Sequence, residues 1–418
     1  MVTSENTSEH RAFSRRGFLA GALASGAALT LTSQLAFAQQ MLSGRKITVE
    51  NIRGVGVDPG LVRMNLNENP LGASPKAIKA IADNLFEVGR YGSEERDVVN
   101  ALAAFEGVVL PAPAPGAAMD ETALFRGPVS PYLVTAGSSQ ALNLITLAYL
   151  SRNGGEIVEA KFGYGQIARS SEAYKQMFGV AVNVIRAPMT PGFKHDLDAM
   201  LKLITPKTTM VVITNPNNPT GTLLEPAEIE AFVKKVPANV LVIVDEAYIH
   251  FAERDPVPSV IPMVANYENL VAVRTFSKAY GMAGLKLGYS VSSQKVKMEL
   301  IKYFSGGANL LASVAGKAAV EDLDHLQRSR EMVWSFKKRC YAEFDKLGLE
   351  YVPTQGTFMM VNLKRESAPI VRELRKRNVM ISNRRDEEFK NWIRVSAGTN
   401  DETEVFLQTL KDVLSAAS

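Results

Sequence analysis

A regular alternation of short apolar runs with helical stretches is the feature that most constrains the fold of this chain. The runs are of strand length and rich in β-branched residues. Because such runs are typical of strands buried on both faces, the pattern predicts an α/β fold with a mostly parallel sheet sandwiched by helices. The expected strands are Tyr132–Thr135, Glu156–Glu159, Val180–Ile185, Met210–Thr214, Val240–Val244 and Leu270–Arg274.

The segments around this core indicate more than one domain. With 418 residues the chain can form two or three domains. Ser74 as N-cap and Pro75 at the first helical position predict a helix over Pro75–Phe86, and one long helical stretch runs from about Ala312 to Leu347, before a mixed α/β tail. We expect an N-terminal arm at 39–74, a large domain at 75–311 with a Pro-, Ala- and Gly-rich insertion at 108–131, and a smaller C-terminal α/β domain at 312–418.

The first 38 residues look like an export signal. The pair Arg15-Arg16 precedes a largely apolar run that ends in the small-x-small sequence Ala36-Phe37-Ala38. A membrane anchor is the alternative, but the run is barely long enough and polar residues interrupt its second half. We therefore expect a twin-arginine signal peptide at 1–38, recognition by the twin-arginine export machinery, and a periplasmic or secreted protein. That route carries proteins that have already folded.

Charge and cysteine content exclude several classes of protein. The 47 Lys and Arg residues nearly balance the 43 Asp and Glu residues, so the net charge is only +4 and no nucleic-acid partner is indicated. One cysteine, Cys340, permits neither an internal disulfide nor a cysteine-based zinc site. The four histidines are far apart in the sequence, and we expect no metal site.

Two polar segments directly follow expected strands. The sequence from Asn215 to Gly221, Asn-Pro-Asn-Asn-Pro-Thr-Gly, predicts a tight turn at the edge where open α/β sheets bind ligands. Asp245 follows the next strand, where a carboxylate in low-dielectric surroundings favours a cationic partner such as a protonated pyridine nitrogen. Tyr248 lies three residues on and can hydrogen-bond a phenolic oxygen. Taken singly, the first segment can be only a turn and the second only a helix N-cap.

Lys278 is a candidate Schiff-base nucleophile. It follows an apolar strand in the sequence Thr-Phe-Ser-Lys and begins a loop punctuated by glycines. The amine must be partly deprotonated to act, and burial would lower its pKa. A surface lysine on a flexible loop is the simpler alternative for such a residue.

Gly137, Ser138 and Ser139 bridge an expected strand and an expected helix over Ser138–Leu150. Free backbone N–H groups at a helix N-terminus form a cradle for phosphate, and the two hydroxyls add donors. A serine N-cap has a similar sequence, so this segment alone does not distinguish the two.

In this order the four segments resemble the fold-type I pyridoxal-phosphate aminotransferases (class I/II), and among them the histidinol-phosphate aminotransferase-like group. The resemblance extends from about Met64 to the C-terminus. It includes Asn65–Gly72, the Arg90-Tyr91-Gly92 step and Arg394–Thr399. It implies a pyridoxal 5′-phosphate cofactor and a homodimer with shared sites.

The resemblance also implies roles for individual residues. Lys278 would hold the cofactor and move the proton at the substrate carbon, and Asp245 would keep the pyridine nitrogen protonated. Arg394 would bind the carboxylate or other anionic end of the substrate. The other implied contacts are Asn215 and Tyr248 for the phenolic oxygen, Phe162 for ring stacking (or a core phenylalanine), and Gly137, Ser138, Ser139, Ser277, Lys286 and the neighbouring subunit's copy of Tyr91 for the phosphate.

Three departures from the family pattern bear on the substrate and the cofactor. Lys286 stands where the family has a phosphate-binding arginine, which keeps the charge but loses the planar fork. Leu71 replaces a tyrosine that in histidinol-phosphate enzymes helps hold the substrate phosphate. A second arginine is missing near Ile381–Ser382, although Arg384 and Arg385 lie close by. The last two losses, together with export, argue against histidinol phosphate as the physiological substrate.

The leading functional prediction is an exported aminotransferase that acts between an amino acid or amine-bearing small molecule and a 2-oxo acid. A lyase or decarboxylase on the same scaffold and a histidinol-phosphate aminotransferase proper are the alternatives. A non-catalytic binding protein is a third, but the joint presence of the lysine, aspartate, asparagine and tyrosine argues against it.

Overall fold

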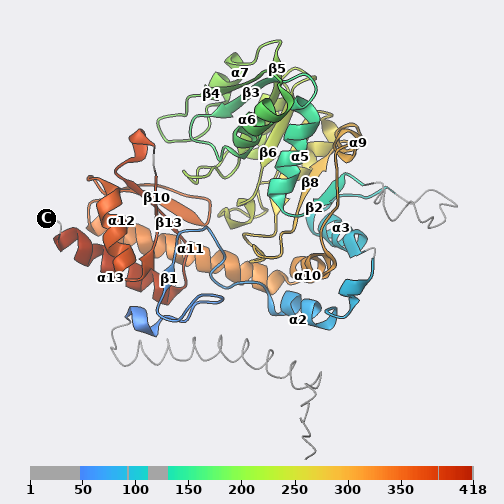
Figure 1. Ribbon diagram of the computed structural model, residues 1–418. Coiled ribbons are helices and arrows are strands. Elements are labelled where there is room, and N and C mark those ends of the chain that lie inside the picture. The colour runs from blue at the N-terminus through green and yellow to red at the C-terminus, as the bar shows by residue number, and fades with distance from the viewer. Residues whose placement is uncertain (1–47, 92–93, 112–129, 385, 417–418) are drawn as a thin grey trace, which may run out of the picture. The chain divides into compact units, whose positions relative to one another are not determined.

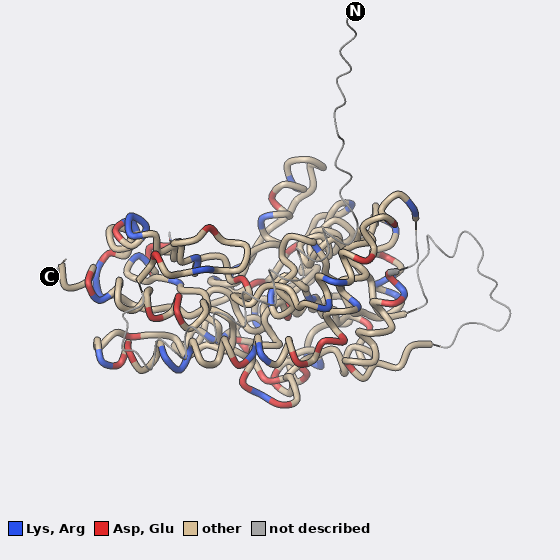
Figure 2. Tube along the Cα trace, turned by 90° about the horizontal axis from the view of Figure 1, so that it is seen from below, with Lys and Arg blue, Asp and Glu red and all other residues tan. Residues whose placement is uncertain are grey.

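The computed structural model describes residues 48–91, 94–111, 130–384 and 386–416. The expected signal peptide, most of the 108–131 insertion and Arg385 lie outside the described residues. The described residues form one compact unit. Basic and acidic residues are interspersed over the described part of this unit (Figure 2). None of the helices described there has the length and apolar character needed to cross a membrane.

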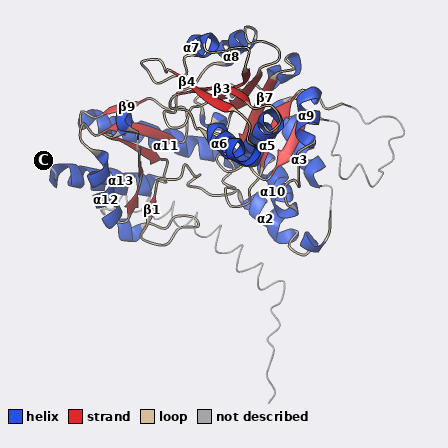
Figure 3. Cartoon of the chain, turned by 45° about the horizontal axis from the view of Figure 1, so that its top comes forward, coloured by secondary structure: helices blue, strands red, loops and turns tan. Residues whose placement is uncertain are grey.

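The larger sheet confirms the predicted core. Its seven strands lie in the order β2-β8-β7-β6-β5-β3-β4, and helices flank it (Figure 3). Only β8 runs antiparallel to its neighbours, β2 and β7. The strands are β2 (Tyr132–Thr135), β3 (Gly155–Ala160), β4 (Val182–Ala187), β5 (Thr208–Thr214), β6 (Leu241–Asp245), β7 (Leu270–Thr275) and β8 (Gly288–Ser292).

Alternate residues of these strands pack on opposite faces of the sheet, as the two-residue period of a strand requires. Ile243 belongs to a core with α5 (Ser138–Leu150), α6 (Gln166–Phe178) and α9 (Gln294–Ile301). Val242 and Val244 belong to the core on the other face. The helices that contribute to that core include α3 (Glu94–Glu106), α7 (Leu197–Lys202), α8 (Pro226–Val233) and α10 (Leu310–Val320).

A four-stranded antiparallel sheet forms in the C-terminal part, in the order β12-β13-β10-β9. The segment expected to be an arm joins this part, because β1 (Val62–Arg63) pairs in parallel with β11 (Val379–Met380) (Figure 1). The remaining elements here are β9 (Glu350–Val352), β10 (Phe358–Asn362), β12 (Ser382–Asn383), β13 (Trp392–Ser396), α11 (Leu323–Lys346), α12 (Ser367–Lys376) and α13 (Asn400–Ala416).

Two helix predictions need correction. The first helix, α2, spans Pro75–Asp83 and so ends before Phe86, although Ser74 caps it as expected by accepting the Ala77 N–H at 3.0 Å. The long helical stretch is two helices, α10 and α11, because Asp322 leaves the helical conformation with φ −95° and ψ 68°. The described chain also has short 3₁₀ helices at Val49–Asn51, Glu87–Gly89, Ile249–Phe251, Ile261–Asn266 and Glu387–Phe389.

Candidate active site

The predicted segments meet at one edge of the large sheet. β2, β5, β6 and β7 run in the same direction, so the residues that follow them share the carboxyl edge. β8 begins at this edge, where Gly288 pairs with both Thr135 and Thr275. The site therefore lies where open α/β sheets bind ligands.

Lys278 is half-buried at this edge rather than fully exposed on the surface. Its Nζ donates to the Leu66 carbonyl at 3.4 Å and lies 5.6 Å from the ring centre of Tyr248. Burial lowers the pKa of Lys278 to about 8, with Glu68 and Asp245 opposing and Arg394 adding to the effect. A neutral amine, the form that attacks a carbonyl, is therefore accessible near physiological pH.

Asp245 ends β6 with 3% of its surface exposed. Its Oδ1 accepts the Ala247 N–H at 3.1 Å, and no described residue forms an ion pair with it. Burial raises the pKa of Asp245 to about 7. A buried carboxylate with so little compensation gains stability from a cationic group, which is what a protonated pyridine nitrogen provides.

The prediction for Asn215 needs correction, because its amide is occupied elsewhere. Asn215 Nδ2 donates to the Leu224 carbonyl at 2.9 Å, and the Leu224 N–H donates to Oδ1 at 2.7 Å. The amide thus fixes the path of the chain after the turn. Asn218 faces the site instead, where its Nδ2 donates to Tyr248 Oη at 3.5 Å.

Arg394 lies on β13 and reaches the same group of residues from the C-terminal sheet. Its guanidinium donates to Asn218 Oδ1 at 3.0 Å and to the Asn65 carbonyl at 3.1 Å. Nε is buried without a hydrogen-bond partner, and burial lowers the pKa of Arg394. These are the properties of a site for a carboxylate, which can satisfy several guanidinium donors at once.

Residues 65–69, which we call the strap, contribute contacts that the sequence did not assign. The strap accepts from Arg394 and Lys278 through two backbone carbonyls. Asn67 donates from Nδ2 to Tyr248 Oη at 3.0 Å and is itself bonded to Ser396. The motif Asn65–Gly72 was visible in the sequence, but which of its side chains turn inward was not.

Backbone at the start of α5 meets the loop that leads into β8. A Cβ on Gly288 would lie 2.3 Å from the Ser138 nitrogen, and one on Gly137 would lie 3.9 Å from Lys286 Cα. Gly137 precedes α5 with φ 85° and has no side chain to cap the helix, so helix donors face this space. Ser138 and Ser277 are half-buried, while Ser139 and Lys286 are exposed. The group has the donors and the charge that a phosphate requires.

The structure places the side chain of Phe162 in an aromatic cluster. Its ring packs against Phe389 with centres 4.6 Å apart, next to Phe193 and Trp392. The core alternative thus describes its packing. Tyr164 is half-buried. Burial raises its pKa, the negative charge of Asp245 adds to this effect, and the positive charge of Arg394 opposes it.

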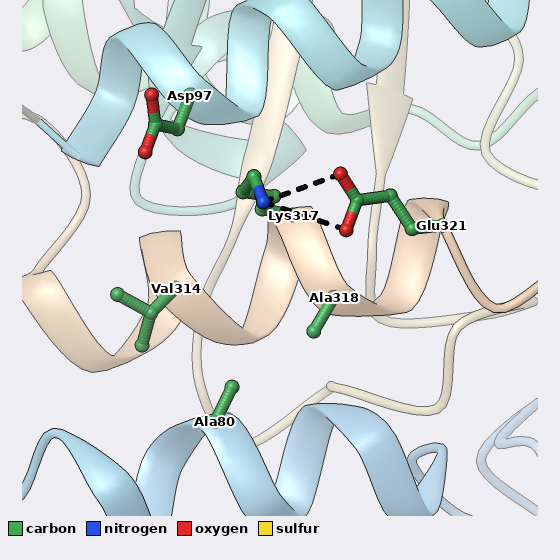
Figure 4. A pocket seen from close by; sticks show the side chains of 6 residues that line it. All are labelled: Ala80, Asp97, Val314, Lys317, Ala318 and Glu321. Carbon is green, nitrogen blue, oxygen red and sulfur yellow. Dashed lines mark hydrogen bonds and ion pairs between the residues drawn. The ribbon is translucent and has the colours of Figure 1, made fainter.

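Tyr91 makes no contribution to the site of its own chain, since its side chain is fully exposed. A surface hollow of about 240 Å³ lies apart from the predicted residues, between α2, α3 and α10 (Figure 4). Its polar groups are Asp97 and the ion pair Lys317–Glu321, with 3.3 Å between Nζ and Oε1. It contains none of the residues implied by the family resemblance.

Comparison with known proteins agrees with this geometry. The chain matches the family model for aminotransferase class I and II over residues 59–410. It is 37% identical to histidinol-phosphate aminotransferase 2 of Pseudomonas fluorescens over 88% of this chain and 93% of that protein. It is 36% identical to the Pseudomonas aeruginosa protein of the same name, with the same coverage of both chains.

Solved structures show the same fold. The histidinol-phosphate aminotransferase of Sinorhizobium meliloti, in complex with pyridoxal 5′-phosphate, superimposes with a TM-score of 0.74. The match has 23% identity and covers 91% of this chain and 94% of the other. From the family match and these relatives, we conclude that the chain belongs to the class I and II aminotransferases and is a pyridoxal-phosphate-dependent enzyme.

Proposed function

We propose that this enzyme transfers an amino group between a carboxylate-bearing amine and a 2-oxo acid outside the cytoplasm. The observation that carries the proposal is the shared network of Lys278, Tyr248, Asn218 and Arg394. It brings a nucleophilic amine and a carboxylate anchor to the same phenol. An amino acid and a 2-oxo acid both present a carboxylate next to the reacting carbon.

The residues fit pyridoxal phosphate, which when bound supplies the electron sink for chemistry at the substrate carbon. Asp245 would pair with the ring nitrogen, and Lys278 would hold the cofactor covalently and then move the proton at the substrate carbon. Tyr248 and Asn218 would hold the phenolic oxygen. The phosphate would be held by backbone N–H groups at Gly137–Ser139, by Ser277 and by Lys286.

Histidinol phosphate is the second candidate substrate, because the relatives named above are histidinol-phosphate aminotransferases. Against it, Ser382 stands directly across from Arg394 on β12, where a second arginine was expected. The Ser382 hydroxyl donates to the Asn65 carbonyl at 3.0 Å and has no charge to offer a phosphate. We therefore favour an unphosphorylated amino donor.

The test is an absorption titration of the purified full-length enzyme loaded with pyridoxal phosphate. Amino acids and histidinol phosphate are supplied separately as donors, each with and without a 2-oxo acid. Conversion of the bound cofactor to its amine form, highest in kcat/KM for an amino acid, supports the proposal. A preference for histidinol phosphate overturns the substrate assignment. Release of ammonia or carbon dioxide without a 2-oxo acid would indicate a lyase.

We further propose a homodimer in which Tyr91 reaches the phosphate of the partner's site. Tyr91 is fully exposed, and the apolar side chains of Leu85 and Val88, in the same stretch of chain, are 38% and 60% exposed. Exposed apolar side chains close together in the chain favour burial against another chain. Analytical ultracentrifugation is expected to show a dimer, and a monomer at micromolar concentration would contradict this.

Export rests on the paired Arg15-Arg16 and the following apolar run to Ala38. We expect the protein in a periplasmic fraction, shortened to begin near Gln39. Replacement of both arginines by lysine is expected to keep it in the cytoplasm. An unprocessed protein in the cytoplasmic fraction of the unmodified strain would overturn this part of the proposal.

A further inference from the structure

Asn67 links the C-terminal sheet to the hydroxyl of Tyr248. Its backbone N–H donates to Ser396 Oγ at 2.9 Å, and the Ser396 hydroxyl donates to Asn67 Oδ1 at 2.8 Å. Asn67 Nδ2 in turn donates to Tyr248 Oη at 3.0 Å. The three residues are only 2%, 1% and 5% exposed, so water does not compete for these bonds.

The directions of these hydrogen bonds follow from their partners. Ser396 Oγ accepts the Asn67 backbone N–H and donates its own hydrogen to Asn67 Oδ1, so the amide faces Tyr248 with Nδ2. The second amide, that of Asn218, has the Arg394 guanidinium as its partner, which can only donate. It takes Asn218 Oδ1 and leaves Asn218 Nδ2 directed at Tyr248.

Tyr248 therefore accepts from two amide donors, at 3.0 and 3.5 Å. A phenol oxygen accepts through its lone pairs and donates its one hydrogen. No residue in the described part of the chain accepts that hydrogen. The hydroxyl is thus committed to donate to whatever acceptor the ligand presents.

We propose that Asn67, locked by Ser396, is a positioning residue that directs the hydrogen of Tyr248 at the phenolic oxygen of pyridoxal phosphate. The inference rests on the proposed contact between Tyr248 and that oxygen. Such preorganised donation stabilises charge on the oxygen without reorientation. Asn67 holds a left-handed backbone conformation, φ 55°, which a residue with a side chain adopts at a cost and which its two bonds to Ser396 maintain.

This role has a spectroscopic consequence that is separate from turnover. A donor to the phenolic oxygen stabilises its negative charge, so the bound cofactor loses a proton at lower pH. The pH midpoint of the visible absorption band of enzyme-bound pyridoxal phosphate therefore reports where the Tyr248 hydrogen points. Loss of this donation is expected to raise the midpoint by about one to two pH units.

The test is Asn67→Asp, which keeps the shape and the acceptor for Ser396 but replaces the donor with a second acceptor. Tyr248 would then donate to the new carboxylate and turn away from the cofactor, and the midpoint is expected to rise. An unchanged midpoint would overturn the proposal. Asn383→Asp adds the same charge at an exposed position of β12 and is expected to leave the midpoint within a few tenths of a pH unit.

A carboxylate near the cofactor also raises the midpoint through its charge alone, and a double-mutant cycle separates the two effects. In a Tyr248→Phe background there is no hydroxyl to redirect, so the shift caused by Asn67→Asp is expected to fall to less than half. The same shift in both backgrounds would show a charge effect only and overturn the proposal.

Ser396→Ala provides a second route that adds no charge and also serves if Asn67→Asp does not fold. It frees the Asn67 amide to rotate, and we expect a smaller rise in the midpoint, absent in the Tyr248→Phe background. No rise would contradict the locking role of Ser396. A wild-type enzyme that shows no absorption band or accepts no amino group would refute the proposed function. Normal transamination, with Asn67→Asp shifting the midpoint equally in the wild-type and Tyr248→Phe backgrounds, would refute only this inference.

Discussion

At the scale of single residues, burial moves the pKa values of two ionisable groups of the site towards neutral pH. Lys278 has its pKa lowered to about 8 and Asp245 has its pKa raised to about 7, and in both the main cause is loss of water. The sequence predicted both residues because each follows an apolar strand. It assigned Asn215 where the structure has Asn218, because side-chain direction inside a turn depends on backbone partners such as Leu224.

The raised pKa of Asp245 predicts a pH dependence of stability for the cofactor-free protein. Because the folded-state pKa is higher than the unfolded one, the native state loses stability as pH rises from about 4 through about 7. Asp245→Asn removes this loss, so the variant is expected to match wild type near pH 4 and to exceed it at pH 8. The gain is up to about 4 kcal/mol by denaturant unfolding. If the variant and the wild type were equally stable at pH 4 and also at pH 8, the Asp245 carboxylate would not lack a compensating partner.

Lys286 gives a prediction for cofactor affinity. Lys286→Gln removes the charge beside the start of α5, and the Kd for pyridoxal phosphate is expected to rise roughly ten- to a hundredfold. Lys286→Arg restores the planar fork and is expected to bind at least as tightly as wild type. Lys317→Gln, in the separate hollow of Figure 4, is the matched control and should leave Kd unchanged. An unaffected Kd in Lys286→Gln would remove this residue from the phosphate site.

At the scale of secondary-structure elements, the sequence predicts best those elements whose pattern lies within a few consecutive residues. Runs such as Val240–Val244 are continuous and apolar, and each lies within one residue or two of an observed strand. β8 was missed because the sequence Gly-Tyr-Ser-Val-Ser contains no apolar run. The break between α10 and α11 was missed because helical patterns continue on both sides, and Asp322 instead pairs with Lys76 from α2 at 3.3 Å.

A buried ion cluster joins the end of β6, which carries Asp245, to the end of β7, which leads to Lys278. Arg274 on β7 pairs with Glu246, next to Asp245, at 2.9 Å and with Glu106 at the end of α3 at 2.8 Å. All three side chains are at most 4% exposed. Burial raises the pKa of Glu106, while the positive charge of Arg274 opposes this. The cluster holds the ends of β6 and β7 in a fixed relation and depends on its central cation.

Arg274→Met is therefore expected to destabilise the protein strongly, since it leaves two buried carboxylates without a cation. We expect a loss of about 3–5 kcal/mol in urea unfolding. Lys295→Met breaks the exposed pair with Glu268 and is the matched control, with an expected loss of less than about 1 kcal/mol. Similar losses in the two variants would show that the buried cluster has no special structural role.

At the scale of the whole molecule, the proposed homodimer with shared sites predicts complementation between two impaired variants. Lys278→Ala lacks the nucleophile, and Tyr91→Ala lacks the contact proposed to reach the partner's site. A mixed dimer of the two variants contains one intact site. Random subunit exchange in an equal mixture makes about half of the dimers mixed, so roughly a quarter of wild-type activity is expected. Steady-state assays before and after mixing measure this. No recovery despite confirmed exchange would place Tyr91 outside the partner's site.

The pairing of β1 with β11 affects when this enzyme becomes competent during its synthesis. Residues 62–67 contact strands that are translated more than three hundred residues later, and through Asn65 and Asn67 they support the site itself. The strap can form its contacts with Ser396 only after residue 396 has left the ribosome. The nascent chain therefore has no complete site to bind the cofactor. Export coupled to translation would move the chain across the membrane before the site had formed. The twin-arginine route proposed above carries folded proteins and would therefore fit this order of events.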